Sequence, residues 1–250
     1  MKRGAFLFSI LFLIQSAFAA SEDGNEQVTQ MLKDRPAMAT YSDSKGVVHT
    51  LAPDDPLFVA AATLFEVDGS VTHIAWNSQQ PTTMCEIADH SISTAQNPVT
   101  WIRLSTTEPC YNTGAIPFER LWSALFFEFE NILNDSFFTS LTHDAYAGKF
   151  SKCEWVEQTT RLEYSALNLQ KTFYLSTFAP WATGHDFVSN SGLWKSTLPS
   201  TYESWAATFK NPNSYPWDSW GSFYDNQISF YLNESNIPIP TRSCPDLPIP

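Results

Sequence analysis

Two long stretches of the chain place apolar residues three or four positions apart, the spacing of one face of a helix. In residues 117–134 this stripe runs without an internal Gly or Pro. In residues 152–174 a similar stripe follows Ser151, and Glu154 stands at the position that completes a capping box. The pattern therefore predicts two long helices, over 117–134 and 152–174, and the sequence itself marks the start of the second.

The part of the chain before these helices has shorter patterns. Residues 71–76 and 99–104 alternate in the manner of strands. Residues 57–67 form an apolar run that is too short for periodicity to distinguish a buried strand from a helix. Residues 43–56 and 77–97 are typical of loops.

The second half of the chain is predicted to be mainly helical. Residues 136–150 indicate a short helix and a turn, and short helices are expected over 201–209 and 219–232. The tail, 237–250, contains too many prolines for regular structure and should run extended over the surface. The fold class that follows is α+β, with a few short N-terminal strands followed by a mainly helical half.

The first nineteen residues have the pattern of a secretory signal peptide. Lys2 and Arg3 form a basic start, Ala5–Ile14 is apolar, and small residues stand at the positions that a signal peptidase reads before a cut after Ala19. The apolar run is short for a membrane span, although an amino-terminal anchor is the alternative. We therefore expect a protein that is secreted or periplasmic, with residues 20–250 forming a single domain.

Charge and composition narrow the class of partner. The formal net charge is −12, and removal of Lys2 and Arg3 with the signal peptide makes it −14. An acidic chain with few cations is poorly suited to nucleic acid or to an anionic membrane, because both carry negative charge. Hydrophobic residues make up 43% of the chain, which argues against general disorder. We expect a folded protein that does not stay inserted in a membrane once the signal peptide is removed.

The four cysteines predict up to two disulfides in an exported protein. Three pairings are possible. We favour Cys85–Cys110, which closes a local loop, together with Cys153–Cys244, which would fix the C-terminal tail to a helix. The spacing does not match a zinc knuckle.

The chain has no nucleophile elbow, no phosphate-binding loop and no pair of histidines four residues apart. In the first predicted helix, however, a central acid, Glu128, follows Phe127 and precedes Asn131 by three positions. The strand over 99–104, the loop after it and this helix resemble the core of the zincin metallopeptidases, whose helix carries the motif HExxH. In that family the two histidines bind zinc, and the glutamate activates the water bound to the metal.

The resemblance implies a scaffold that has lost its metal. Only Glu128 matches the motif, while Phe127 and Asn131 occupy the positions of the two histidines. A phenyl ring cannot ligate zinc, and an amide alone would not hold it. The resemblance therefore implies a non-catalytic protein without a cofactor that binds another macromolecule. An alternative without this resemblance is that Glu128 is an ordinary acid on an amphipathic helix.

Two further functions remain open. Glu163 on the second predicted helix could face Glu128 and form the carboxylate pair of a hydrolase that acts on peptides, cell wall or sugar polymers. The aromatic C-terminal region could instead form a carbohydrate-binding module, with Trp205, Trp217 and Trp220 as binding residues. The expected partner is an unidentified protein or polysaccharide.

Overall fold

The computed structural model describes residues 22–66, 74–81, 87–91, 100–107, 114–213 and 215–242 of the chain. Its fold class is α+β, as the sequence predicts. The chain divides into two compact units, Met1–Phe129 with Ser176–Ser189 (unit 1) and Glu130–Leu175 with Asn190–Pro250 (unit 2). The expectation that residues 20–250 fold as one cooperative domain stays a prediction, and the predicted signal peptide lies outside the described residues.

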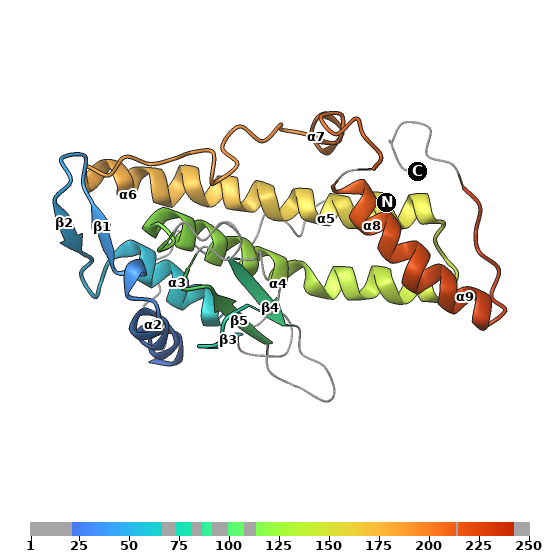
Figure 1. Ribbon diagram of the computed structural model, residues 1–250, viewed down its shortest axis with the longest axis horizontal. Coiled ribbons are helices and arrows are strands. Elements are labelled where there is room, and N and C mark those ends of the chain that lie inside the picture. Colours follow the sequence, from blue (N-terminus) through green and yellow to red (C-terminus); the bar gives the residue numbers. More distant parts are fainter. Residues whose placement is uncertain are drawn as a thin grey trace. The chain divides into compact units, whose positions relative to one another are not determined.

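Unit 1 combines short strands with helices (Figure 1). Its elements, in chain order, are α2 (Glu22–Asp34), the 3-10 turn η1 (Pro36–Met38), β1 (Thr40–Ser42), β2 (Val48–Thr50), α3 (Pro56–Glu66), β3 (Ile74–Trp76), β4 (Ala88–Ser91), β5 (Thr100–Leu104), the first part of α4 (Phe118–Tyr146) and α6 (Ala179–Gly184). The ambiguous apolar run at 57–67 is therefore helical. The two expected strands are present, and the structure adds β2 and β4 inside segments that we expected to be loops.

The sheet of unit 1 has the strand order β3-β5-β4. β5 pairs in parallel with β3 and antiparallel with β4. Asp89 of β4 lies opposite Arg103 of β5, and the guanidinium donates a hydrogen bond of 2.8 Å from Nε to the carboxylate. Because Asp89 is paired across the two strands, β4 is stable without the alternation of apolar and polar residues by which strands are predicted from a sequence.

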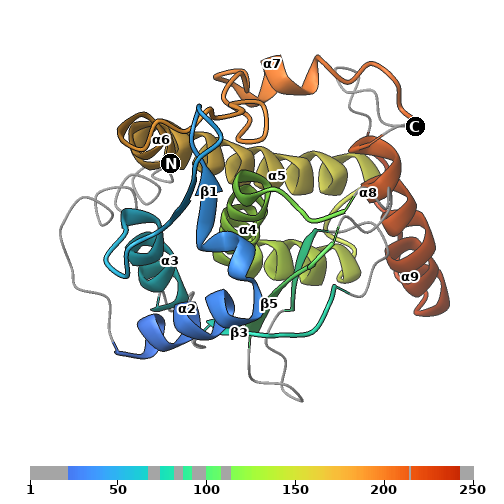
Figure 2. The ribbon, with the colours of Figure 1, turned by 60° about the vertical axis from the view of Figure 1, so that its left-hand side comes forward.

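A buried arginine connects the end of α2 to this sheet. Arg35 is 4% exposed, and its Nε donates to the carbonyl oxygen of Leu104 at 2.7 Å. Next to it, the indole Nε1 of Trp76 donates to Asp34 at 2.9 Å. Figure 2 shows α2 beside β3, which is the arrangement that these contacts fix, and α3 packs against both elements.

The regular elements of unit 2 among its described residues are all helices or helical turns (Figure 1). Its elements are the second part of α4, α5 (Lys152–Phe173), part of the π-helical turn η2 (Tyr174–Phe178), α7 (Tyr202–Ala206), α8 (Trp217–Phe223), the π-helical turn η3 (Tyr224–Ser229) and α9 (Phe230–Glu234). Helix α4 continues without a break to Tyr146, so the separate short helix expected within 136–150 is wrong, whereas the turn expected there is present at 147–148. Its continuation is supported by Phe138, whose ring lies 5.2 Å from that of Trp220.

The turn between α4 and α5 is tightly defined. Gly148 has a φ of 70°, in the left-handed region that favours glycine. A Cβ atom at this position would lie 2.7 Å from Cγ2 of Ile237.

The capping box predicted at the start of α5 is confirmed, because Ser151 accepts a hydrogen bond from the backbone N–H of Glu154, and Glu154 accepts one from the backbone N–H of Ser151.

The core of unit 2 is an aromatic cluster built on α5. α8 and α7 pack against this helix, and Trp155 and Trp217 are both fully buried. The buried members of the cluster are Ala145, Trp155, Val156, Leu198, Tyr202, Trp205, Ala206, Trp217, Tyr224, Ile228 and Leu232. None of the helices among the described residues is both long and apolar enough to cross a bilayer.

The capping box gives a direct test of what holds the start of α5. We expect Ser151→Ala to lower the free energy of unfolding by about 1 kcal/mol, because the N–H groups of the first turn lose their acceptor. Ser140→Ala, at an exposed position within α4, is the matched control and should change it by less than about 0.5 kcal/mol. The measurement is urea unfolding of both variants, and an equal effect in the two would contradict a capping role.

Candidate functional site

Glu128 lies in unit 1 and is paired with a histidine. Its residue is 8% exposed, and Oε2 lies 2.6 Å from Nδ1 of His90 on β4. A carboxylate at this distance fixes the imidazole orientation and satisfies a buried acid. The predicted partner Glu163 belongs to unit 2, so the pairing of Glu128 with Glu163 stays a prediction.

The two positions that correspond to zinc ligands in the zincin motif lie on the same helix as Glu128. Phe127 and Asn131 are both half-buried on α4. Within the described residues there is no group of three His, Cys, Asp or Glu side chains that could hold a metal ion. His73 and three of the four cysteines lie outside these residues.

Glu163 has a different environment, because it lies on the apolar face of α5. It follows Trp155 and Thr159 at intervals of four residues, so the helix directs it to the same side as these two buried residues. Burial raises the pKa of Glu163 to about 7, while nearby Tyr215 and Trp220 act in the opposite direction by hydrogen bonding to the carboxylate. At pH 7 about half of the Glu163 side chains are therefore neutral carboxylic acids.

The start of α8 positions the two aromatic neighbours of Glu163. Trp217 is fully buried, and its Nε1 donates to the carbonyl oxygen of Phe209 at 3.1 Å. This anchor fixes Tyr215 just before the helix and Trp220 one turn inside it. The ring of Trp220 lies 5.7 Å from that of Trp155, so its position is set by the core.

Tyr215 connects the buried carboxyl to solvent. The residue is 51% exposed, yet burial of its hydroxyl and the neighbouring Glu163 both raise the pKa of the phenol. Part of this side chain is therefore accessible to solvent, although its hydroxyl bonds to Glu163. The phenol donates a hydrogen bond to the carboxylate, which places an accessible aromatic ring beside Glu163.

Two polar atoms of this site have unused hydrogen-bonding capacity. Oε2 of Glu163 and Nε1 of Trp220 are buried, and neither has a well-aligned hydrogen-bond partner among the described residues. The indole lies close enough to lower the pKa of the carboxyl without forming a bond of good geometry with Oε2. A buried polar atom without a partner costs about 1–3 kcal/mol, so a further group that meets these atoms would be favourable.

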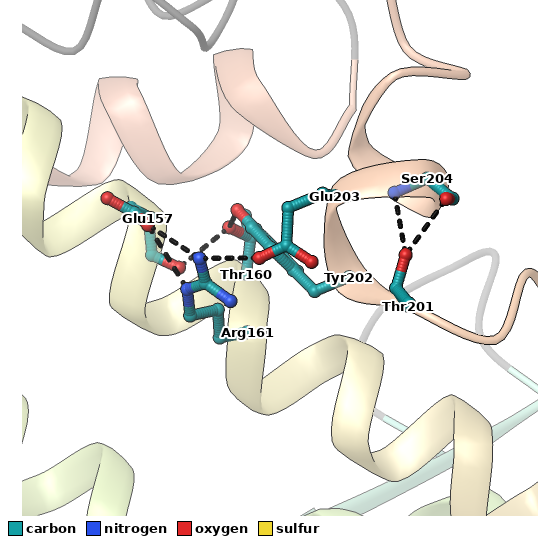
Figure 3. A network of polar contacts seen from close by, with 7 residues as sticks. All are labelled: Glu157, Thr160, Arg161, Thr201, Tyr202, Glu203 and Ser204. Carbon is teal, nitrogen blue, oxygen red and sulfur yellow. Dashed lines mark hydrogen bonds and ion pairs between the residues drawn. The ribbon is translucent and has the colours of Figure 1, made fainter.

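The nearest arginine on α5 is committed to other acids. Arg161 donates to Glu157 at 2.9 Å and to Glu203 at 3.1 Å, and its Cζ lies 4.0 Å from the ring centroid of Tyr202 (Figure 3). Glu157 and Arg161 thus form an ion pair four residues apart on α5. Because residues two apart on a helix point in nearly opposite directions, Arg161 does not neutralise Glu163.

The three predicted binding tryptophans have different positions. Trp205 and Trp217 are 4% and 0% exposed, and both belong to the aromatic core, so they offer no face to a ligand. Trp220 is half-buried and is the only one of the three beside Glu163. The structure thus brings Glu163 and Trp220 together, and it adds Tyr215, which the sequence did not single out.

Sequence reasoning also missed His90, which lies on a strand that we expected to be a loop.

The predicted disulfides are not tested by the described residues. Cys153 is buried on α5 and is not a free thiol, but Cys85, Cys110 and Cys244 lie outside the described residues. The pairings Cys85–Cys110 and Cys153–Cys244 stay predictions.

Comparison of this chain with protein-family models, with curated proteins and with solved structures finds no match.

A second buried acid in unit 2 is Glu130 on α4. Its residue is 7% exposed, and Oε2 has no hydrogen-bond partner among the described residues. Burial raises the pKa of Glu130 to about 8. This carboxyl stays protonated in the folded chain at neutral pH.

These shifts predict a pH-dependent stability. The pKa of Glu130 is about 8 in the folded chain against 4.5 for an unperturbed glutamate, so the unfolded chain loses this proton first as pH rises. The free energy of unfolding should fall between pH about 4.5 and about 8, and Glu163 should act in the same direction up to about pH 7. We expect Glu130→Gln to remove about 2–4 kcal/mol of this loss, measured by urea unfolding at pH 5 and pH 8.5.

The matched control is Glu234→Gln, at an exposed position on α9, which should leave the pH dependence unchanged. An unchanged pH dependence in Glu130→Gln would contradict a protonated Glu130 in the folded chain.

Proposed function

We propose that this chain is an exported binding protein that does not catalyse hydrolysis. The observation that carries the proposal is the hydrogen bond of 2.6 Å between Glu128 and His90. A water-activating base needs a carboxylate that reaches the reacting water, whereas this one is buried and already engaged within the fold of unit 1. Together with Phe127 and Asn131 at the ligand positions, this supports a metallopeptidase-like scaffold that is used for binding.

The environment of Glu163 also favours binding over catalysis. Glycoside hydrolysis uses two carboxyl groups on either side of the scissile bond. The neighbours that alter the pKa of Glu163 are Tyr215 and Trp220, and neither of them is a second carboxylate. Glu163 can donate a hydrogen bond here, but the acid/base pair of a hydrolase would need a partner from elsewhere in the chain.

The test is to incubate the mature chain, from residue 20 onward, with casein and with peptidoglycan. We expect no release of peptides or of reducing sugars above the rate of a heat-denatured control. Glu128→Gln should leave this result unchanged and should lower the free energy of unfolding by about 1–3 kcal/mol, because His90 loses a charged partner. Release of products by the wild type that disappears in Glu128→Gln would overturn the proposal in favour of a hydrolase.

A further inference from the structure

We propose that Glu163, Tyr215 and Trp220 form a binding site for a neutral saccharide. The inference rests on the proposed binding function and specifies the ligand of unit 2. It depends on three properties of the site, which are an exposed aromatic ring, unused hydrogen-bonding groups beside it, and the lack of an available cation on the adjoining turns of α5.

The first property is the ring of Tyr215. A sugar ring presents a face of weakly polar C–H groups, which packs favourably against the electron-rich face of an aromatic ring. Tyr215 is 51% exposed, while its hydroxyl end is held by Glu163 and the chain after it is anchored by buried Trp217. The ring is therefore both accessible and fixed in place, which lowers the entropy lost when a ligand binds.

The second property is the match in hydrogen bonding. A sugar hydroxyl both donates and accepts, and so does a protonated carboxyl group, whereas an indole N–H only donates. At this site, Oε2 of Glu163 and Nε1 of Trp220 are buried and have no well-aligned partner among the described residues. Because the Glu163 residue is half-buried rather than fully buried, a sugar hydroxyl at the edge of this site could exchange a hydrogen bond with its carboxyl group.

The third property is charge. Arg161, on the adjoining turn of α5, is held in an ion pair with Glu157 at 2.9 Å, and Lys152, at the start of the helix, is paired with Asp225 at 2.8 Å. Lys171, two turns after Glu163, donates to the carbonyl oxygen of Leu198 at 2.7 Å. An anionic ligand would have to break one of these contacts, and the net charge of −12 would oppose its approach. A neutral ligand meets neither cost. A cationic peptide is the competing ligand class, and it would need an ionised Glu163 rather than a neutral one.

The experiment is isothermal titration of the mature full-length chain with soluble neutral oligosaccharides, using chitohexaose, cellohexaose and maltohexaose as probes and pentalysine as the cationic probe. We expect saturable binding of at least one oligosaccharide at pH 6 and none of pentalysine. Tyr215→Ala and Glu163→Leu should each weaken binding by about tenfold or more, because they remove the ring and the hydrogen-bonding group.

Two variants separate the site from general effects. Glu163→Gln keeps a neutral group that donates and accepts, so it should bind within about threefold of the wild type. Tyr231→Ala removes a tyrosine of the same unit with a similar exposure of 47% and should leave affinity unchanged. Thermal unfolding of each variant establishes that it is folded before its affinity is compared.

Three results would overturn the inference. These are no binding of any oligosaccharide, binding of pentalysine alone, and oligosaccharide binding that Tyr215→Ala and Glu163→Leu leave unchanged in folded protein. Each of them leaves the proposal of a non-catalytic binding protein standing. Cleavage of a bound oligosaccharide would instead overturn the proposed function while keeping the ligand class, so the two failures are distinguishable.

Discussion

The periodicity of α5 is the constraint on which unit 2 depends. One face of this helix packs the aromatic cluster through Trp155, and Glu163 lies on the same face two turns later. The periodicity of a helix fixes the side on which each residue lies. The carboxyl group of Glu163 therefore lies on the apolar face of α5, together with Trp155 and Thr159. The raised pKa of Glu163, its contact with Trp220 and its unused oxygen all follow from that placement.

Three buried charges of unit 1 differ from Glu163, because each of the three has a partner within the fold. Arg35 donates to backbone carbonyls, Arg103 is paired with Asp89, and Glu128 is paired with His90. Burying a charge is tolerated when its hydrogen bonds are satisfied, and these contacts also tie α2, β4 and α4 to the sheet. These three side chains therefore stabilise the fold of unit 1, whereas Oε2 of Glu163 in unit 2 has no well-aligned partner among the described residues.

Local patterns in the sequence were sufficient for the long helices, the capping box, the strand at 100–104 and the fold class. They failed where a residue's role is set by a distant contact. Strand β4 is polar, because Asp89 and His90 are satisfied by Arg103 and Glu128 from other elements. Such a strand has no apolar alternation to recognise.

In the candidate site, too, residue types could be predicted from local patterns, whereas contacts between distant residues could not. Glu163 and Trp220 could be chosen by residue type, since an acid within an apolar stripe and an aromatic residue in a weakly patterned region are both visible in the sequence. Their proximity could not be predicted, because it depends on how α8 packs against α5. Tyr215 had no signal of its own, and it gains its role only from the buried Trp217 that follows it.

The turn at Gly148 links the length of one loop to the path of a remote segment. The glycine has a positive φ, and Ile237 packs into the space where any other residue would carry its Cβ atom. In divergent sequences that keep this fold, position 148 should therefore tolerate no other amino acid, although it is a turn residue without chemistry. The loop between α4 and α5 is also unsuited to insertions, because added chain there would compete with residues 237–238 for the same surface.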